Sequence, residues 1–197
     1  MNSNAGKVAR FGMLTALALV LGWLDRAIPV TWFLSGAVPG IKLGLANTVL
    51  LYAVYLMDWK GCVLLMLAKV FLSGFMFGSM SAILYSLSGG VLSLAVMLLV
   101  RHRPRLGALL IALACLAAAV AFAIIGRHPE YGVLGTSLAG AVAHNVGQIL
   151  AASAMLRTPQ LLYTYLPVLV GIGAVVGCLT GIVAQRVFKS LRVGNIQ

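Results

Sequence analysis

Long apolar runs, separated by short polar gaps, constrain this chain more than any other feature of its sequence. Six runs cover residues 11–28, 43–57, 61–80, 83–100, 133–156 and 161–187, and a further alanine-rich run covers 106–125. A helix needs about 20 apolar residues to cross a bilayer, and fewer when it is buried among neighbours. Only 9% of the 197 residues are charged, against roughly a quarter in soluble domains. We therefore predict an all-α, polytopic integral membrane helix bundle, which forms a single transmembrane domain over residues 1–197.

The basic residues lie mostly in the short gaps between the apolar runs. Lysine and arginine total 14, against three acidic residues, and the formal net charge is +11. Basic residues that gather in the connections are typical of membrane proteins, whose cytoplasmic loops are enriched in lysine and arginine. The chain has no basic face with interleaved aromatic residues, so we expect no nucleic-acid partner.

The same basic residues bear on whether six or seven runs cross the membrane. If the N-terminus is cytoplasmic and 106–125 makes no net crossing, ten of the 14 basic residues lie inside, three lie outside, and Lys69 lies within a span. If 106–125 crosses, the split becomes seven against six, which the positive-inside rule disfavours. Hydropathy favours seven crossings, because this run has no central proline or glycine. We expect six core transmembrane helices and an extra membrane-lying or re-entrant segment at 106–125.

Two lysines lie at or near membrane depth. Lys42 begins the second run, and Lys69 lies inside the third. A charge at the bilayer centre costs at least about 2.5–3.5 kcal/mol. Lys42 can extend its amine to the membrane surface, whereas Lys69 lies about 13 Å from the end of its run at 1.5 Å per residue. Lys69 is then deprotonated, hydrated in a cavity, or matched by a bound anion such as a phosphate, diphosphate or carboxylate.

The acidic residues are too few and too scattered to serve Lys69 or a metal ion. Asp25, Asp58 and Glu130 all fall at the ends of apolar runs, so we expect no carboxylate within the membrane to neutralise Lys69. Magnesium–diphosphate chemistry needs clustered carboxylates. The sequence also lacks a nucleophile elbow, a P-loop and a zinc motif. These absences argue against an enzyme, and we expect no cofactor and no metal site.

Polar side chains also cluster in the run at 133–156. His144 and Gln148 are four residues apart and share one helix face, while Asn145 lies about 100° around the helix. Such residues either hydrogen-bond neighbouring helices to one another or contact a ligand, and the sequence leaves both roles open. Asn47, close after Lys42, is a further candidate.

Four motifs taken together resemble a known membrane family. PGIKLGLAN at 39–47, LSGFMFG at 72–78, SLSGGVLS at 86–93 and GAVAHNVGQ at 140–148 occur in this order. The chain closely resembles the family labelled heptaprenyl diphosphate synthase component I, also called the Gx transporter family, over about 39–187. Two features depart from the family: it usually has arginine where Lys69 stands, and a short loop where 106–125 stands.

The resemblance implies a function. The family is similar to the S-components of energy-coupling-factor transporters, which are six-helix proteins that bind a vitamin or a precursor. It implies a bacterial cell membrane protein that takes up a small anionic molecule with the help of an energy-coupling transmembrane subunit and ATPases. The substrate-binding candidates are Lys42, Asn47, Lys69, His144, Asn145 and Gln148, and the partner-docking candidates are Gly12, Ala16, Ala18 and Gly22. The family label implies an alternative: a noncatalytic membrane subunit linked to heptaprenyl diphosphate synthase and the menaquinone side chain.

Overall fold

The described part of the chain is entirely helical, as the sequence predicts. The computed structural model describes residues 4–27, 44–102 and 132–190, so Lys42 and the segment 106–125 lie outside the described residues. Its helices are α1 (Asn4–Ala27), α2 (Asn47–Leu56), α3 (Trp59–Phe77), α4 (Met80–His102), α7 (Gly132–Leu156) and α8 (Gln160–Ser190). These six helices correspond one to one with the six predicted spans.

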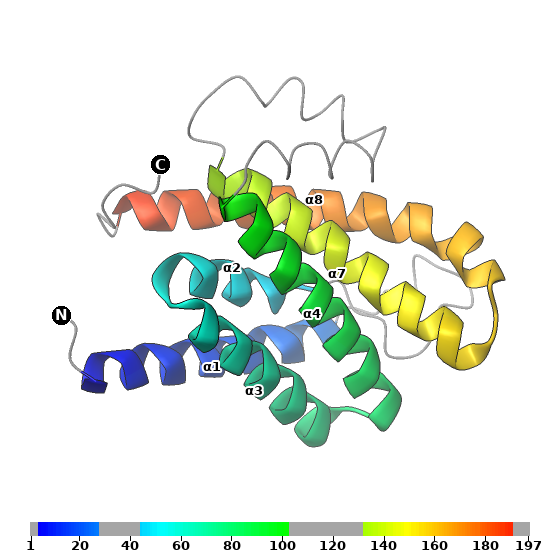
Figure 1. The fold of residues 1–197 in the computed structure, drawn as a ribbon, viewed down its shortest axis with the longest axis horizontal. Helices are drawn as coiled ribbons and strands as arrows, with labels where there is room; N and C mark the ends of the chain where they lie inside the picture. The colour runs from blue at the N-terminus through cyan, green and yellow to red at the C-terminus, as the bar shows by residue number, and fades with distance from the viewer. Residues whose placement is uncertain (1–3, 28–43, 103–131, 191–197) are drawn as a thin grey trace.

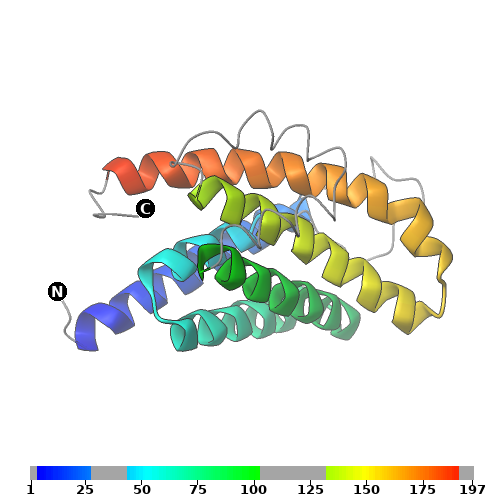
Figure 2. The same ribbon diagram turned by 45° about the horizontal axis from the view of Figure 1, so that its top comes forward.

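Successive helices run in alternating directions along the bundle (Figures 1 and 2). The start of α1, the α2–α3 turn, the end of α4, the start of α7 and the end of α8 lie at one end. Side chains confirm the grouping: the Tyr55 and Thr136 hydroxyls are hydrogen-bonded at 3.0 Å, and the Arg101 guanidinium lies 5.3 Å from the centre of the Tyr55 ring. The end of α4 and the start of α7 therefore lie at the same end of the bundle.

We call this end of the molecule the basic end, because most of the described basic residues lie there. Four of them line one cleft between α1, α3 and α4, and two lie in the last turns of α8. These residues are Lys7, Arg10, Lys60, Arg101, Arg186 and Lys189. The turn between α7 and α8, which contains Arg157, lies at the opposite end. The described basic residues thus gather mainly at one end of the bundle, and the side of the membrane that this end faces stays a prediction.

Four helices, α1, α3, α4 and α8, are long and apolar enough to cross a membrane. Their outward faces carry large apolar side chains: Met13 is 66% exposed, Phe75 74% and Val183 56%. A surface of this kind is unfavourable in water but is the ordinary lipid-facing surface of a transmembrane bundle. These helices support the association of the protein with a lipid bilayer.

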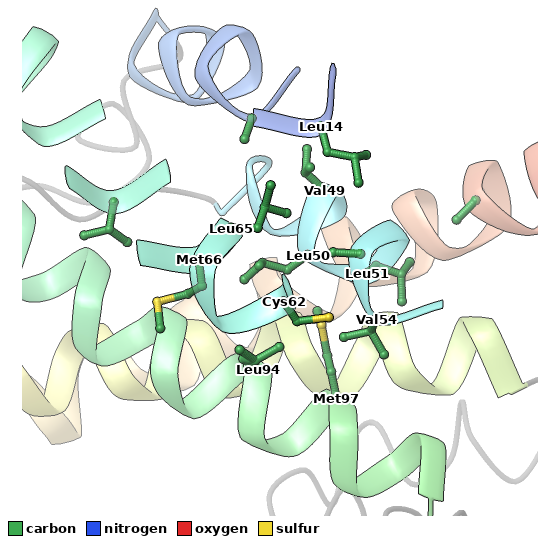
Figure 3. Close-up of a cluster of buried hydrophobic side chains, with 14 of the residues drawn as sticks. Leu14, Val49, Leu50, Leu51, Val54, Cys62, Leu65, Met66, Leu94 and Met97 are labelled. Carbon is green, nitrogen blue, oxygen red and sulfur yellow. The ribbon is translucent and has the colours of Figure 1, made fainter. Parts of the chain in front are cut away.

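The other two helices, α2 and α7, are interior. The apolar cluster in Figure 3 surrounds α2, whose Leu50 and Leu51 have no exposed surface. Helix α7 packs mainly against α4 on one side and α8 on the other, and 16 of its 25 residues are buried. Because neither helix faces lipid along its length, α2 can be short and α7 can carry polar side chains.

Glycines bring α7 close to its neighbours. A Cβ placed on Gly147 would lie 2.8 Å from the Gly89 Cα of α4, and one on Gly177 of α8 would lie 2.9 Å from the Leu138 Cα of α7. Helices approach this closely only where small residues form the contact. The close α4–α7 contact fixes the position of the polar side chains on α7.

Candidate ligand-binding site

The turn at residues 44–47, just before α2, is the point at which the buried polar groups meet. Gly44 has a φ of +86°, a left-handed conformation that glycine adopts without strain. The turn is closed by hydrogen bonds from Asn47 N to Gly44 O at 2.8 Å and from Thr48 N to Leu45 O at 3.0 Å. Helix α2 therefore begins at Asn47. The remaining polar groups of the turn face the neighbouring helices.

Asp25 of α1 holds the start of this turn. Its Oδ2 accepts hydrogen bonds from Gly44 N at 2.9 Å and Leu45 N at 3.1 Å, and the side chain is 3% exposed. Two backbone N–H donors stabilise a carboxylate that has lost its water. Asp25 lies in the last turn of α1, where the sequence places it, but its burial was not predicted from the sequence.

Lys69 of α3 holds the other end of the turn. It is 6% exposed, and its Nζ donates to Asn47 Oδ1 at 2.7 Å and to Ala46 O at 3.4 Å. The Asn47 Nδ2 in turn donates to Ser93 Oγ of α4 at 3.1 Å. This chain of hydrogen bonds links three helices, and it brings the predicted residues Asn47 and Lys69 into direct contact.

His144 of α7 lies against the turn, and Gln148 of the same helix is hydrogen-bonded to His144. Their Nε2 atoms are 3.1 Å apart and hydrogen-bonded, which confirms that the two side chains share a helix face. A Cβ placed on Gly44 would lie 2.9 Å from His144 Cδ2, and one on Gly89 would lie 2.7 Å from His144 Nδ1. The imidazole thus lies between two glycines, one from the turn and one from α4.

Asn145 lies on a different face of α7 and contacts α8. Its Nδ2 donates to Leu169 O at 2.7 Å, and a Cβ on Gly173 would lie 2.7 Å from the same nitrogen. Within the described ranges, the Asn145 Oδ1 has no hydrogen-bond partner. Of the three predicted residues on α7, Asn145 faces α8, whereas His144 and Gln148 face α4.

We use the name polar hub for the turn at residues 44–47 together with the side chains that converge on it from α1, α3, α4 and α7. These side chains are Asp25, Lys69, Ser93, His144 and Gln148. The hub contains the amine of Lys69, the carboxyl group of Asp25, an imidazole and two amides, all buried. Among the described residues, no group of three His, Cys, Asp or Glu side chains is placed to hold a metal ion.

Ser93 and Asp25 were absent from the predicted site. Ser93 is the last residue of the SLSGGVLS motif, but a serine in an apolar helix commonly bonds its own backbone, so its sequence gives little sign of a contact with Asn47. Asp25 does carry a signal, because an acid directly after an apolar run is costly unless it has partners. Finding those partners requires the path of the chain.

The small residues of α1 fall on two different faces. Ala18 is 1% exposed and Gly22 is buried, and a Cβ on Gly22 would lie 3.5 Å from Ser73 Oγ of α3. Gly12 and Ala16 are exposed, and a Cβ on Gly12 would meet no atom within 4 Å. Ala18 and Gly22 therefore lie within the bundle, which leaves Gly12 and Ala16 as the small residues on the outer face.

Comparison with known proteins gives one family. A family model described as heptaprenyl diphosphate synthase component I matches residues 14–125 and 106–187. The two matched ranges contain every residue of the polar hub, and they overlap over 106–125, the run that the sequence marks as a departure from the family. Neither the search of curated proteins nor the search of solved structures found a match.

Proposed function

Because the chain belongs to the heptaprenyl diphosphate synthase component I family, we propose that it is the substrate-binding membrane component of a transporter and takes up a small anionic molecule through the polar hub. The observation that carries this proposal is the burial of Lys69, whose Nζ donates to Asn47 Oδ1 and Ala46 O, at a point where polar side chains from four helices converge.

A purely structural hub is the less favourable explanation. Buried charged groups contribute little net stability, and well-packed apolar residues often replace them without loss. Here side chains from four helices converge on one four-residue turn, three of them through hydrogen bonds and His144 through close packing on Gly44. Ionisable residues within membrane segments characteristically mark substrate or ion pathways. Ligand recognition explains this convergence better than helix packing does.

The roles within the hub follow from its chemistry. Lys69 would take a phosphate, diphosphate or carboxylate group, because an anion offsets the cost of burying the ammonium. His144 and Gln148 would bond the rest of the ligand, while Gly44 and Gly89 would allow it to approach the backbone closely. Asp25 fixes the turn. Lys42, which lies outside the described residues, is a second candidate for the anion.

The transport reaction would depend on partners and on a defined orientation. The sequence has no nucleotide-binding motif, so energy would come from separate ATPases through an energy-coupling transmembrane subunit. Gly12 and Ala16, on the outer face of α1, are the candidate docking residues. The basic end would face the cytoplasm of a bacterial cell, because cytoplasmic connections are enriched in lysine and arginine, and the N-terminus would lie on that side.

The description of the family favours a second candidate function. A noncatalytic membrane subunit linked to heptaprenyl diphosphate synthase, and so to the menaquinone side chain, would use the same hub to hold the diphosphate group of an isoprenoid. This alternative agrees with the sequence, which lacks the clustered carboxylates of a self-sufficient prenyltransferase. The two functions differ in the ligand: a water-soluble anion in the first, an isoprenoid diphosphate in the second.

One experiment addresses both candidates. The protein is purified from its native membrane, co-purified small molecules are identified by mass spectrometry, and the compound found is titrated against the wild type, Lys69→Met, Lys69→Arg and a control, Lys189→Met. Lys69→Met keeps the side-chain volume but removes the charge, so it should abolish binding, while Lys69→Arg and Lys189→Met retain it. Unchanged binding by Lys69→Met would refute the anion site, and an isoprenoid diphosphate as the compound would replace uptake with the second function.

A further inference from the structure

A cleft at the basic end of the bundle lies outside the polar hub and is used by none of the roles above. It has a volume of about 1060 Å³ and lies between the first turns of α1, the α2–α3 turn and the last turns of α4. Its polar lining consists of Lys7, Arg10, Asp58, Lys60, Arg101 and His102, and its apolar lining includes Phe11, Leu64 and Leu98. The cleft is thus both strongly charged and partly apolar.

The charge of the cleft is unbalanced. Lys7, Arg10, Lys60 and Arg101 are cations, and Asp58 is the one acid among the lining residues. Arg101 is held in place over the Tyr55 ring, with 5.3 Å between the guanidinium carbon and the ring centre. Charges of one sign gathered in a cleft with low-dielectric walls concentrate the electrostatic field, so the cleft attracts an anion.

A helix terminus adds to this field. Helix α3 begins at Trp59, within the lining of the cleft, and Asp58 precedes it without a side-chain capping hydrogen bond. The first N–H groups of a helix have no partner within the helix and bear a partial positive charge. They are donors of the kind that bind phosphate groups at helix N-termini, and here they lie beside Lys60 and Arg101.

The apolar side of the cleft continues onto the outer surface of the bundle. Leu64 is 57% exposed, and Trp59 at the mouth of the cleft is 61% exposed; the Lys60 Nζ lies 5.7 Å from the centre of the Trp59 ring. Tryptophan and lysine together mark the membrane–water interface. A ligand that fits this surface has an anionic head and apolar chains.

We propose that this cleft binds the phosphate group of an anionic phospholipid, whose acyl chains lie against the exposed apolar faces of α1 and α3. Basic pockets between transmembrane helices at a cytoplasmic interface are suited to anionic headgroups. The four cations and the uncapped N-terminus of α3 would hold the phosphate, and Leu64 would contact the upper part of a chain. A soluble phosphate compound has the same anionic group, but it has no apolar chain that could contact the apolar side of the cleft.

The test measures lipid proximity at Trp59. The full chain, with Trp23→Phe and Trp32→Phe so that Trp59 is the only tryptophan, is placed in phosphatidylcholine nanodiscs with a brominated phospholipid that quenches tryptophan on contact. Brominated phosphatidylglycerol should quench at a mole fraction at least about fivefold lower than brominated phosphatidylcholine, since each nearby basic residue is worth about 1 kcal/mol. Equal quenching by the two lipids would overturn the proposal.

Matched variants separate the cleft from a general effect of positive charge. Lys7→Gln with Lys60→Gln removes two charges from the cleft, and Arg186→Gln with Lys189→Gln removes two from the same end outside it. The first pair should lose the preference for phosphatidylglycerol and the second should keep it. Preference that survives the first pair, or is lost equally in both, contradicts the proposal. Reversal of quenching by millimolar glycerol 3-phosphate would show that the cleft takes a soluble phosphate compound instead of a lipid.

Discussion

Replacing Gly89 with alanine should separate α4 from α7 and destabilise the bundle. The new Cβ would lie 2.7 Å from both His144 Nδ1 and the backbone O of His144, and 2.9 Å from Gln148 Cγ. Side chains can move away, but a helix carbonyl cannot move without its helix. Because Gly147 also packs directly on Gly89, any separation of α4 from α7 would also break the close contact between these two glycines.

The magnitude follows from two opposed effects. Alanine is favoured over glycine within a helix by roughly 0.5–1 kcal/mol, and overpacking a tight contact costs about 1–3 kcal/mol. At Gly89 the cost of overpacking should exceed the gain from helix propensity, so the free energy of unfolding should fall by about 1–2 kcal/mol. At Gly90, one residue along, a Cβ would meet Met66 Cγ and Sδ at 3.3 Å, and a flexible methionine can give way. Gly90→Ala should therefore be neutral or stabilising.

The assay compares the two alanine variants in the same micelles. Unfolding by sodium dodecyl sulfate is followed by far-UV circular dichroism, and the free energy of unfolding is obtained for the wild type, Gly89→Ala and Gly90→Ala. The reasoning is refuted if Gly89→Ala is as stable as Gly90→Ala, because the close approach of α4 to the His144 carbonyl would then not limit the packing.

Three further predictions concern other parts of the same structure. Asp25→Ala should lower the free energy of unfolding by about 1–3 kcal/mol, because two buried N–H groups of the turn lose their acceptor; in the same denaturation assay Asp25→Asn should lose less, and equal losses would contradict the capping role. His144→Ala should weaken binding of the co-purified ligand by roughly tenfold or more by isothermal titration calorimetry, with unchanged helicity, if a buried hydrogen bond worth about 1–3 kcal/mol is lost; unchanged affinity would leave His144 a packing role only. In a background without native cysteines, Arg157→Cys should react with an impermeant thiol reagent from outside the cell and Lys60→Cys should not, and the reverse pattern would invert the proposed orientation.

For the described part of the chain, the sequence predicted the number and order of the helices because the apolar runs are bounded by polar or glycine-containing gaps. Its boundaries were less accurate, and the clearest case is the second run. Residues 43–57 were expected to form one span, but α2 extends only over Asn47–Leu56. The left-handed Gly44 and the cap from Asp25 form a turn where an apolar pattern alone predicts helix.

The candidate site was predictable only where a signal lay within one helix. The spacing of His144 and Gln148 is local, and their contact was confirmed. The contact between Lys69 and Asn47 joins two helices, and the chain path decides which polar groups meet. For the same reason the sequence placed Asn145 on a different helix face from His144 but could not show that this face meets α8, nor could it identify the burial of Asp25.

The return of the chain to its starting end after α4 has a consequence for how such a protein can change in length. Any insertion or deletion between α4 and α7 that adds or removes an even number of membrane crossings, or none, leaves the two helices that follow in the same orientation. A single added crossing would have odd parity, and it would carry α7 and α8 upside down and remove His144 from Gly44. The segment between α4 and α7 can therefore gain or lose two membrane crossings, or none, without changing the orientation of α7 and α8.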